Sequence, residues 1–172
     1  DVTLIMGPTQ LAFSANGVNL VNVTTADEMY DVCINKFEQT HITIMAAAVA
    51  DYTPINKADE KIKKNEGSLN VELTNTKDIL KALGEKKKKG QILVGFALET
   101  NNEEAYANQK LKEKNADLIV LNSLNDTGAG FGYDTNKITI FERGGKVYKF
   151  ETKSKSEVAK DIIDTITQLY YA

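Results

Sequence analysis

The chain has 172 residues and a net charge of −3, from 21 basic and 24 acidic side chains, with one cysteine and one histidine. This balance gives no general attraction to nucleic acid or to an anionic membrane, and one cysteine with one histidine excludes a His/Cys zinc cluster within the chain. No apolar run approaches the length of a membrane span, about 20 residues. From the length of the chain we expect one domain over residues 1–172, and we expect it to be cytoplasmic.

The first quarter of the sequence predicts two strands and a helix. Residues 2–6 are apolar, and residues 18–23 alternate as a strand does. Thr25 and Glu28 form a capping box, after which apolar side chains recur at helical spacing: Met29, Val32, Cys33 and Phe37. We interpret Cys33 as a small core residue rather than a nucleophile, and a single cysteine fits a reducing compartment.

The next stretch is the most informative for function. Residues 41–48 predict the central strand, and its end is made of small side chains, which let a ligand approach the backbone. A loop or flap over 52–68 follows and carries a lysine cluster that can meet phosphate. The alternative is a tightly packed strand followed by a solvated, charged loop. His41 stands at the opposite end of the strand, which argues against a Ser-His-Asp triad.

Strands and helices alternate through the rest of the chain. We predict strands over 69–73, 91–96 and 117–121, and helices over 77–84 and 102–115, with Thr76 as N-cap and Gly84 as the end of the first helix. Residues 86–89 are four lysines, interpreted as a solvated turn. A hairpin over 137–141 and 146–150 precedes a last helix that starts at Ser154 or Ser156, with the apolar face Val158, Ile162, Ile163, Ile166 and Leu169.

This alternation predicts an α/β fold with a mainly parallel sheet and helices on both faces. The glycines at 128, 130 and 132 follow a G-x-G-x-G spacing and lead to a hairpin. A dinucleotide fingerprint needs G-x-G-x-x-G and a following helix, so the pattern argues against a dinucleotide-dependent oxidoreductase.

Several polar and aromatic residues follow the predicted strand ends. Lys110 and Lys114 are four residues apart on one helix, where a shared anion would relieve their repulsion, although an exposed face is the simpler interpretation. Phe96 can flank a base or fill the core. The segment 77–80 opens a helix whose free N–H groups attract phosphate. Asp51 can hold Mg²⁺ on a polyphosphate or cap a loop.

Taken together, the motifs resemble one family. They are AAAVADY, KIKK, TKDIL, GFALET, the helix with two lysines, KNADLIVLN and GAGFGYDTNKITI, in this order from residue 1 to about 168. The chain is similar to phosphopantothenoylcysteine synthetase (phosphopantothenate–cysteine ligase), the ligase half of the bifunctional coenzyme A biosynthesis flavoprotein. The resemblance implies a dimer with a Rossmann-like three-layer sandwich, fused to or associated with a decarboxylase half.

The resemblance also implies an activity and a site. The family joins 4′-phosphopantothenate to L-cysteine with CTP and Mg²⁺, through an acyl-cytidylate. Lys61 matches the family's catalytic flap lysine, Ala48 matches an alanine at the reaction centre, and Asp51 is the expected Mg²⁺ ligand. The implied CTP-binding residues are Met45, Ala46, Ala47, Asp51, Lys61, Lys77, Asp78, Ile79, Leu80, Phe96, Lys110 and Lys114.

Two departures from the family pattern stand out. Thr76-Lys77-Asp78 replaces the usual Asn-Pro-Asp, which adds a charge and a backbone N–H. The family's first strand, its glycine-rich turn and its Ser-Asn-x-Ser-Ser-Gly segment, which bears a catalytic asparagine, would precede Asp1. We therefore expect a ligase domain without these elements and without FMN, or, as an alternative, a non-catalytic nucleotide-binding or dimerisation module.

Overall fold

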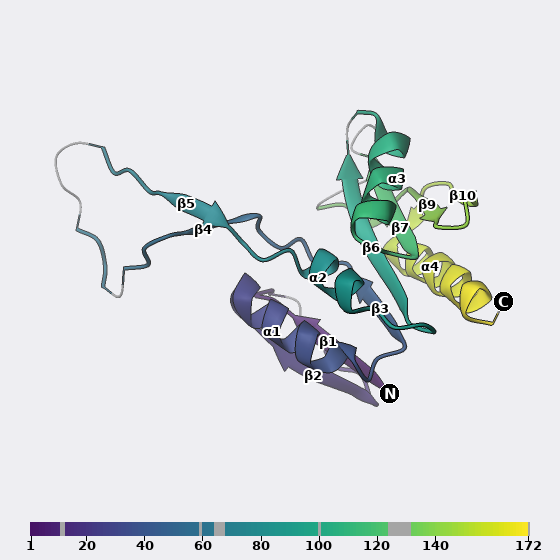
Figure 1. Ribbon diagram of the computed structural model, residues 1–172, viewed down its shortest axis with the longest axis horizontal. Helices are drawn as coiled ribbons and strands as arrows, with labels where there is room; N and C mark the ends of the chain where they lie inside the picture. The colour runs from purple at the N-terminus through teal and green to yellow at the C-terminus, as the bar shows by residue number, and fades with distance from the viewer. Residues whose placement is uncertain (11–12, 59, 64–67, 100, 124–131, 172) are drawn as a thin grey trace. The chain divides into compact units, whose positions relative to one another are not determined.

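The computed structural model describes residues 1–10, 13–58, 60–63, 68–99, 101–123 and 132–171 (Figure 1). The chain divides into two compact units. Unit 1 comprises Asp1–Cys33 and Ala47–Asp78, and unit 2 comprises Ile34–Ala46 and Ile79–Ala172. The assignment of residues 1–172 to one ligase domain stays a prediction.

Unit 1 begins with a parallel strand pair and a helix. Strand β1 (Val2–Met6) pairs in register with β2 (Val18–Asn22), and α1 (Ala26–Phe37) follows, with its residues from Ile34 onward assigned to unit 2. The predicted capping box is confirmed, because the Glu28 N–H donates to Thr25 Oγ1 at 3.1 Å and Glu28 Oε2 accepts from the Thr25 N–H. Cys33 is buried, and burial raises the pKa of its thiol, as a core residue requires.

The remainder of unit 1 contains a two-stranded antiparallel hairpin, β4 (Tyr52–Pro54) and β5 (Leu73–Asn75). The interpretation of 52–68 as loop throughout is therefore wrong at its start, and the strand predicted over 69–73 lies two to four residues later. Proline is compatible with β4 because a two-stranded sheet leaves one side of each strand unpaired. Thr76 does not cap a helix, since its hydroxyl donates to the Ala50 carbonyl at 2.6 Å.

Unit 2 contains a five-stranded sheet in the order β10-β9-β7-β6-β3. Strands β3 (Ile42–Met45), β6 (Ile92–Glu99) and β7 (Leu118–Ser123) are parallel, while β9 (Ile138–Glu142) and β10 (Val147–Lys149) form the predicted hairpin. The prediction that 41–48 is the central strand is wrong, because β3 pairs with β6 alone and lies at the edge of the sheet. A short pair, β8 (Thr135–Asn136) and β11 (Lys153–Ser154), precedes the last helix.

Helices cover both faces of this sheet, which confirms the three-layer α/β prediction. Helix α4 (Lys155–Tyr170) packs Val158, Ile162 and Ile166 against one face. Helix α3 (Glu103–Glu113), which Figure 1 shows beside β6 and β7, covers the other face. It packs Ala107 and Leu111 there, where Leu80 of α2 (Ile79–Lys86) joins them. Each fully buried aliphatic side chain stabilises the fold by about 1.5–3 kcal/mol.

Two details of the last helix refine the prediction. Ser154, rather than Ser156, is the N-cap of α4, and it forms a complete capping box with Glu157. Ile163 was expected on the apolar face but is 51% exposed. Its position differs by one residue, or 100°, from that of Ile162, so only one of the two can face the sheet.

Gly84 and the lysines after it also differ from expectation. Gly84 lies inside α2, not at its end, and a Cβ there would stand 1.9 Å from the Lys114 carbonyl oxygen. Lys87, expected in a solvated turn, has a side chain only 10% exposed that pairs with Asp117 at 2.7 Å. Among the described residues, no helix is both long and apolar enough to cross a membrane.

Candidate functional site

The carboxyl edge of unit 2 brings together three of the predicted CTP-binding residues. Met45 ends β3 and lies in register with Gly95 of β6, directly before Phe96. The Lys110 ammonium reaches from α3 and donates to the Phe96 carbonyl at 2.8 Å. Phe96 is only partly buried, with its ring packed at the margin of the α4-side core. An aromatic ring and a cation therefore lie beside the strand ends, where parallel α/β sheets bind ligands.

The start of α2 approaches the same strand because residue 95 is glycine. A Cβ at Gly95 would stand 2.6 Å from Leu80 Cδ2 and 2.9 Å from Ile119 Cδ1. Ile79 is buried, so the side chains of Ile79 and Leu80 pack into unit 2. Any ligand contact from these two predicted site residues therefore comes from the backbone at the beginning of the helix.

Lys114 lies one residue beyond the end of α3. Its backbone N–H donates to the Lys110 carbonyl at 3.0 Å, and its own carbonyl lies against Gly84 of α2. The backbone position of this second lysine is thus fixed by close packing between two helices. That both ammonium groups meet one anion stays a prediction.

Ala46 follows Met45 and belongs to unit 2. Unit 1 carries the other predicted site residues: Ala47, Ala48, Asp51, Lys61, Lys77 and Asp78. Ala47, Ala48 and Lys61 are exposed. The Asp51 carbonyl accepts from the Thr76 N–H at 2.9 Å, which ties the alanine segment to the turn before α2. The convergence of this group and the unit 2 group on one nucleotide stays a prediction.

The Asp51 carboxylate is compatible with a Mg²⁺ ion that arrives with a triphosphate. Asp51 is exposed, and its carboxylate makes no hydrogen bond or ion pair within the described part of the chain. Among the residues that the structure describes, no three His, Cys, Asp or Glu side chains lie together so that they could hold a metal ion. One available carboxylate, without a protein cage, is a donor set that Mg²⁺ uses with phosphate oxygens.

Lys77 is engaged by α1. Its ammonium lies 3.2 Å from Asp27 Oδ1 and 4.9 Å above the Tyr30 ring. The hydrogen bond to Asp27 raises the pKa of Lys77, which therefore keeps its charge. The ammonium already has a carboxylate partner. If Lys77 contacts CTP, we therefore expect the contact to come from its backbone N–H, which the proline usual at this position in the family would lack.

Asn122 was not among the predicted site residues, although it directly follows the apolar run of β7. It pairs with Leu98 and lies on the same sheet face as Phe96, closer to the carboxyl edge. The side chain of Asn136, 9% exposed, donates to Asn122 Oδ1 at 3.0 Å. This bond orients the Asn122 carboxamide, whose NH₂ group has no acceptor within the residues that the structure describes. The glycine loop that follows falls mostly outside the described residues.

A known protein family matches nearly the whole chain. The profile of the family described as "DNA/pantothenate metabolism flavoprotein C-terminal domain" matches residues 1–170. The chain belongs to this family. A solved C-terminal domain of the coenzyme A biosynthesis bifunctional protein CoaBC is 38% identical, with a TM-score of 0.80 over 98% of this chain and 74% of that one. A pneumococcal DNA/pantothenate metabolism flavoprotein, 20% identical with a TM-score of 0.77, shares the fold.

Curated relatives cover the same residues. The CoaBC protein of Bacillus subtilis is 45% identical over 168 residues, which are 98% of this chain and 41% of that protein. A protein named cysteine/cysteine sulfinic acid decarboxylase, from an unknown prokaryotic organism, is 49% identical over 171 residues, 99% of this chain and 48% of that protein. The chain thus spans about half the length of the curated relatives that it matches.

Proposed function

We propose that this family member is the ligase domain that joins 4′-phosphopantothenate to L-cysteine, using CTP and Mg²⁺ in coenzyme A biosynthesis. The observation that carries the proposal is the 38% identity, over 98% of the chain, with a solved domain named as the C-terminal domain of CoaBC. The side chains at the carboxyl edge of unit 2 support it, since they combine a ring, a cation and amide donors. A cytoplasmic location and association with a decarboxylase half belong to the same proposal.

The first step is attack of the phosphopantothenate carboxylate on the α-phosphate of CTP, with release of pyrophosphate. This step brings negative charges together, so positioned cations lower its barrier most. Lys110 is held beside Phe96, and Lys114 is fixed at the end of α3. Mg²⁺, held by Asp51 and the phosphates, would neutralise charge on the triphosphate. Lys61 supplies a further cation from the flap.

The second step is attack of the cysteine amine on the acyl-cytidylate, with release of CMP. It needs a close approach to an activated carbonyl but no side-chain nucleophile. The one cysteine of the chain is buried with its pKa raised, which fits a structural residue and not a catalytic thiolate. Ala48 leaves room beside the reacting carbonyl, and closure of the Lys61 segment would exclude water from the mixed anhydride.

The nucleotide test is thermal unfolding of the 172-residue chain. CTP with Mg²⁺ at 100 times its Kd should stabilise the fold by about 2.7 kcal/mol, a Tm increase of roughly 5–10 °C. ATP with Mg²⁺ at the same concentration should give less than half this shift. Equal protection by ATP and CTP would contradict the pyrimidine assignment. Pyrophosphate release should require both phosphopantothenate and CTP.

A second candidate function comes from the relative named cysteine/cysteine sulfinic acid decarboxylase. The chain covers 48% of that protein, so the decarboxylase name describes a molecule twice as long. The two functions separate in one assay, in which cysteine or cysteine sulfinate is supplied together with 4′-phosphopantothenate and Mg²⁺, with and without CTP. Release of CO₂ without CTP favours the decarboxylase, and pyrophosphate release favours the ligase. CTP binding without pyrophosphate release favours a non-catalytic nucleotide-binding module.

We also propose that the β4–β5 hairpin makes a homodimer. An isolated two-stranded hairpin is marginally stable in water, and this one exposes large apolar side chains. Tyr52 (61% exposed) and Leu73 (54%) belong to its strands, and Leu69 (68%) and Val71 (56%) lie in the segment that leads into β5. Pairing of two hairpins from two copies would bury them. The homodimer therefore has a specific candidate surface.

Substitution of Leu69→Ser together with Val71→Ser should weaken the dimer at least 10-fold, since about 1.4 kcal/mol corresponds to a tenfold change and each buried side chain is worth more. Sedimentation velocity over a concentration series measures the dissociation constant. Ile163→Ser is the matched control, because Ile163 is also exposed (51%) but belongs to α4. A dimer that survives the double substitution and is lost with Ile163→Ser would assign the interface to α4.

A further inference from the structure

A cleft of about 720 Å³ opens at the amino-end edge of the unit 2 sheet. Gly90–Ile92 lead into β6, Asp117 precedes β7, and the turn Glu142–Gly144 follows the antiparallel strand β9, so all three lie at one edge. Leu169 and Tyr170, at the end of α4, also line it. Neither Phe96 nor Lys110 lines the cleft, which is therefore separate from the proposed nucleotide site.

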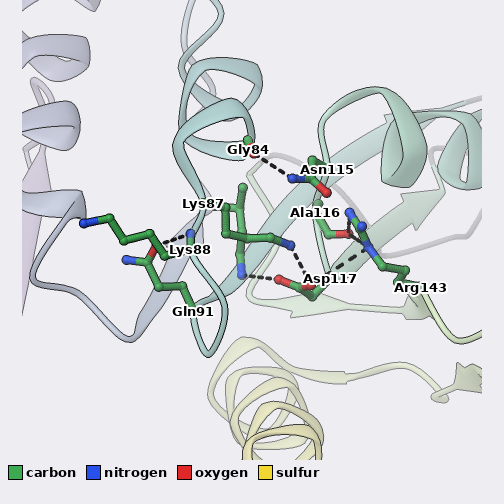
Figure 2. A network of polar contacts seen from close by, with 9 residues as sticks. Gly84, Lys87, Lys88, Gln91, Asn115, Ala116, Asp117 and Arg143 are labelled. Atoms are coloured by element: carbon green, nitrogen blue, oxygen red, sulfur yellow. Dashed lines mark hydrogen bonds and ion pairs between the residues drawn. The ribbon is translucent and has the colours of Figure 1, made fainter.

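Arg143 presents one edge of its guanidinium group in a fixed orientation. Its Nε and Nη2 both donate to the Ala116 carbonyl, at 3.0 and 2.9 Å, and its backbone N–H donates to the Asp117 carbonyl at 2.9 Å (Figure 2). These bonds use the Nε–Nη2 edge. Within the described residues the Nη1–Nη2 edge makes no hydrogen bond, and the side chain is 48% exposed. That edge has the fork geometry that binds a carboxylate through two parallel hydrogen bonds.

The other polar groups of the cleft are satisfied internally. Asp117 Oδ1 accepts from Lys87 Nζ at 2.7 Å, and Oδ2 accepts from the Leu93 N–H at 2.7 Å (Figure 2). The amide nitrogen of Gln91 donates to two backbone carbonyls, and its oxygen accepts from a backbone N–H. Asp117 Oδ1 also lies 3.9 Å from Arg143 Nε, so Asp117 pairs with both Lys87 and Arg143. This ion pair uses the Nε side of the guanidinium group, which leaves the Nη1–Nη2 edge to a ligand.

The surroundings of Arg143 favour a single negative charge on an apolar body. The Glu142 carboxylate, which accepts from a tyrosine hydroxyl at 2.8 Å, lies next to Arg143 in sequence and repels a dianion more than a monoanion. The carbonyl groups at the end of α4 carry partial negative charge, which weakens the binding of a dianion more than that of a monoanion. Ile92, Leu169 and the 42%-exposed ring of Tyr170 provide the apolar wall.

We infer that this cleft binds a small molecule with an apolar body and one carboxylate. The carboxylate lies on the Nη1–Nη2 edge of Arg143, and the body lies on Ile92, Leu169 and Tyr170. The inference is independent of the proposed ligase activity, because it uses none of the nucleotide-site residues.

The probes are 3-phenylpropanoate, the neutral 3-phenylpropanamide and inorganic phosphate, each titrated into the ¹⁵N-labelled 172-residue chain. We expect 3-phenylpropanoate to saturate shifts of the backbone amides at 90–92, 117, 142–144 and 169–170. The amide should bind at least 10-fold more weakly, because charged hydrogen bonds are the stronger ones. Phosphate should leave these amides unshifted at the same concentration. Equal binding of the amide, a phosphate response as large as that of the carboxylate, or shifts elsewhere would overturn the inference.

Two variants and a control localise the carboxylate. Arg143→Lys keeps the charge but removes the forked pair of donors. It should weaken the binding of 3-phenylpropanoate at least 5-fold. Tyr170→Ala removes part of the apolar wall without touching the Ala116 contact, so it tests the site if Arg143→Lys does not fold. Lys160→Gln removes an exposed cation of α4 outside the cleft, and should bind as the unchanged chain does. Unchanged affinity in both Tyr170→Ala and any folded Arg143→Lys protein would overturn the assignment.

Discussion

Lys61→Ala is expected to lower the rate of pyrophosphate release at least about 100-fold, the loss typical when one positioned charge-stabilising group is removed. Lys61 is exposed and lies outside the helices and strands, so its removal should change stability by less than about 0.5 kcal/mol. Loss of rate with an unchanged Tm separates a catalytic role from a folding defect. CTP protection should persist, because Phe96 and Lys110 remain.

Lys57→Ala is the matched control, since Lys57 is exposed in the same segment but does not match the family's flap lysine. Its rate should stay within about 2-fold of the unchanged chain. Both variants should be measured in the 172-residue chain and in a longer form with the family's Ser-Asn-x-Ser-Ser-Gly segment ahead of Asp1. Normal turnover by Lys61→Ala in the form that is active would disprove the assignment.

Periodic patterns predicted most of the fold, because they report which face of an element is buried. The helix that begins at Ala26 was predicted from a capping box, which is present, and the helix that begins at Lys155 was predicted from a serine at its start, which is Ser154. The hairpin around Gly145, whose φ is 90°, followed from its glycines. Patterns fail where strand neighbours decide the outcome. The apolar sequence of β3 says nothing about how many strands pair with it, so its edge position was missed.

The site shows the same division between local and long-range information. The strand predicted over 91–96 extends in the structure to Glu99, so Phe96 lies within β6 and not at its carboxyl end, because Ala97 and Leu98 continue the apolar run. The bond from Lys110 to its carbonyl spans 14 residues and depends on how α3 packs. Asn122 was missed because its role depends on Asn136, and the partner of Lys77 in α1 is 50 residues away. Such pairings become visible only once the chain is folded.

Gly84→Ala is expected to destabilise unit 2 by about 3 kcal/mol or more, the upper range for overpacking a filled interior. The added Cβ would stand 1.9 Å from the Lys114 carbonyl oxygen and 2.8 Å from its carbonyl carbon, and backbone cannot rotate away as a side chain can. The helix α2 must separate from the end of α3, or the Lys114 backbone must move. Because about 1 kcal/mol corresponds to 2–4 °C for a chain of this size, Tm should fall by roughly 6–12 °C.

The same substitution tests whether the packing at Gly84 positions the nucleotide site. If Lys114 moves, the variant should bind CTP more weakly even when it is folded. The measurement is the dissociation constant for CTP at a temperature where the variant is folded, and we expect it to increase. Gly144→Ala is the control, because its Cβ would meet only the mobile end of Glu142 at 2.9 Å, and Gly144 has no positive φ. That variant should lose less than about 1 kcal/mol. If Gly84→Ala and Gly144→Ala have equal Tm values, the close approach of α2 to Lys114 is not present in solution.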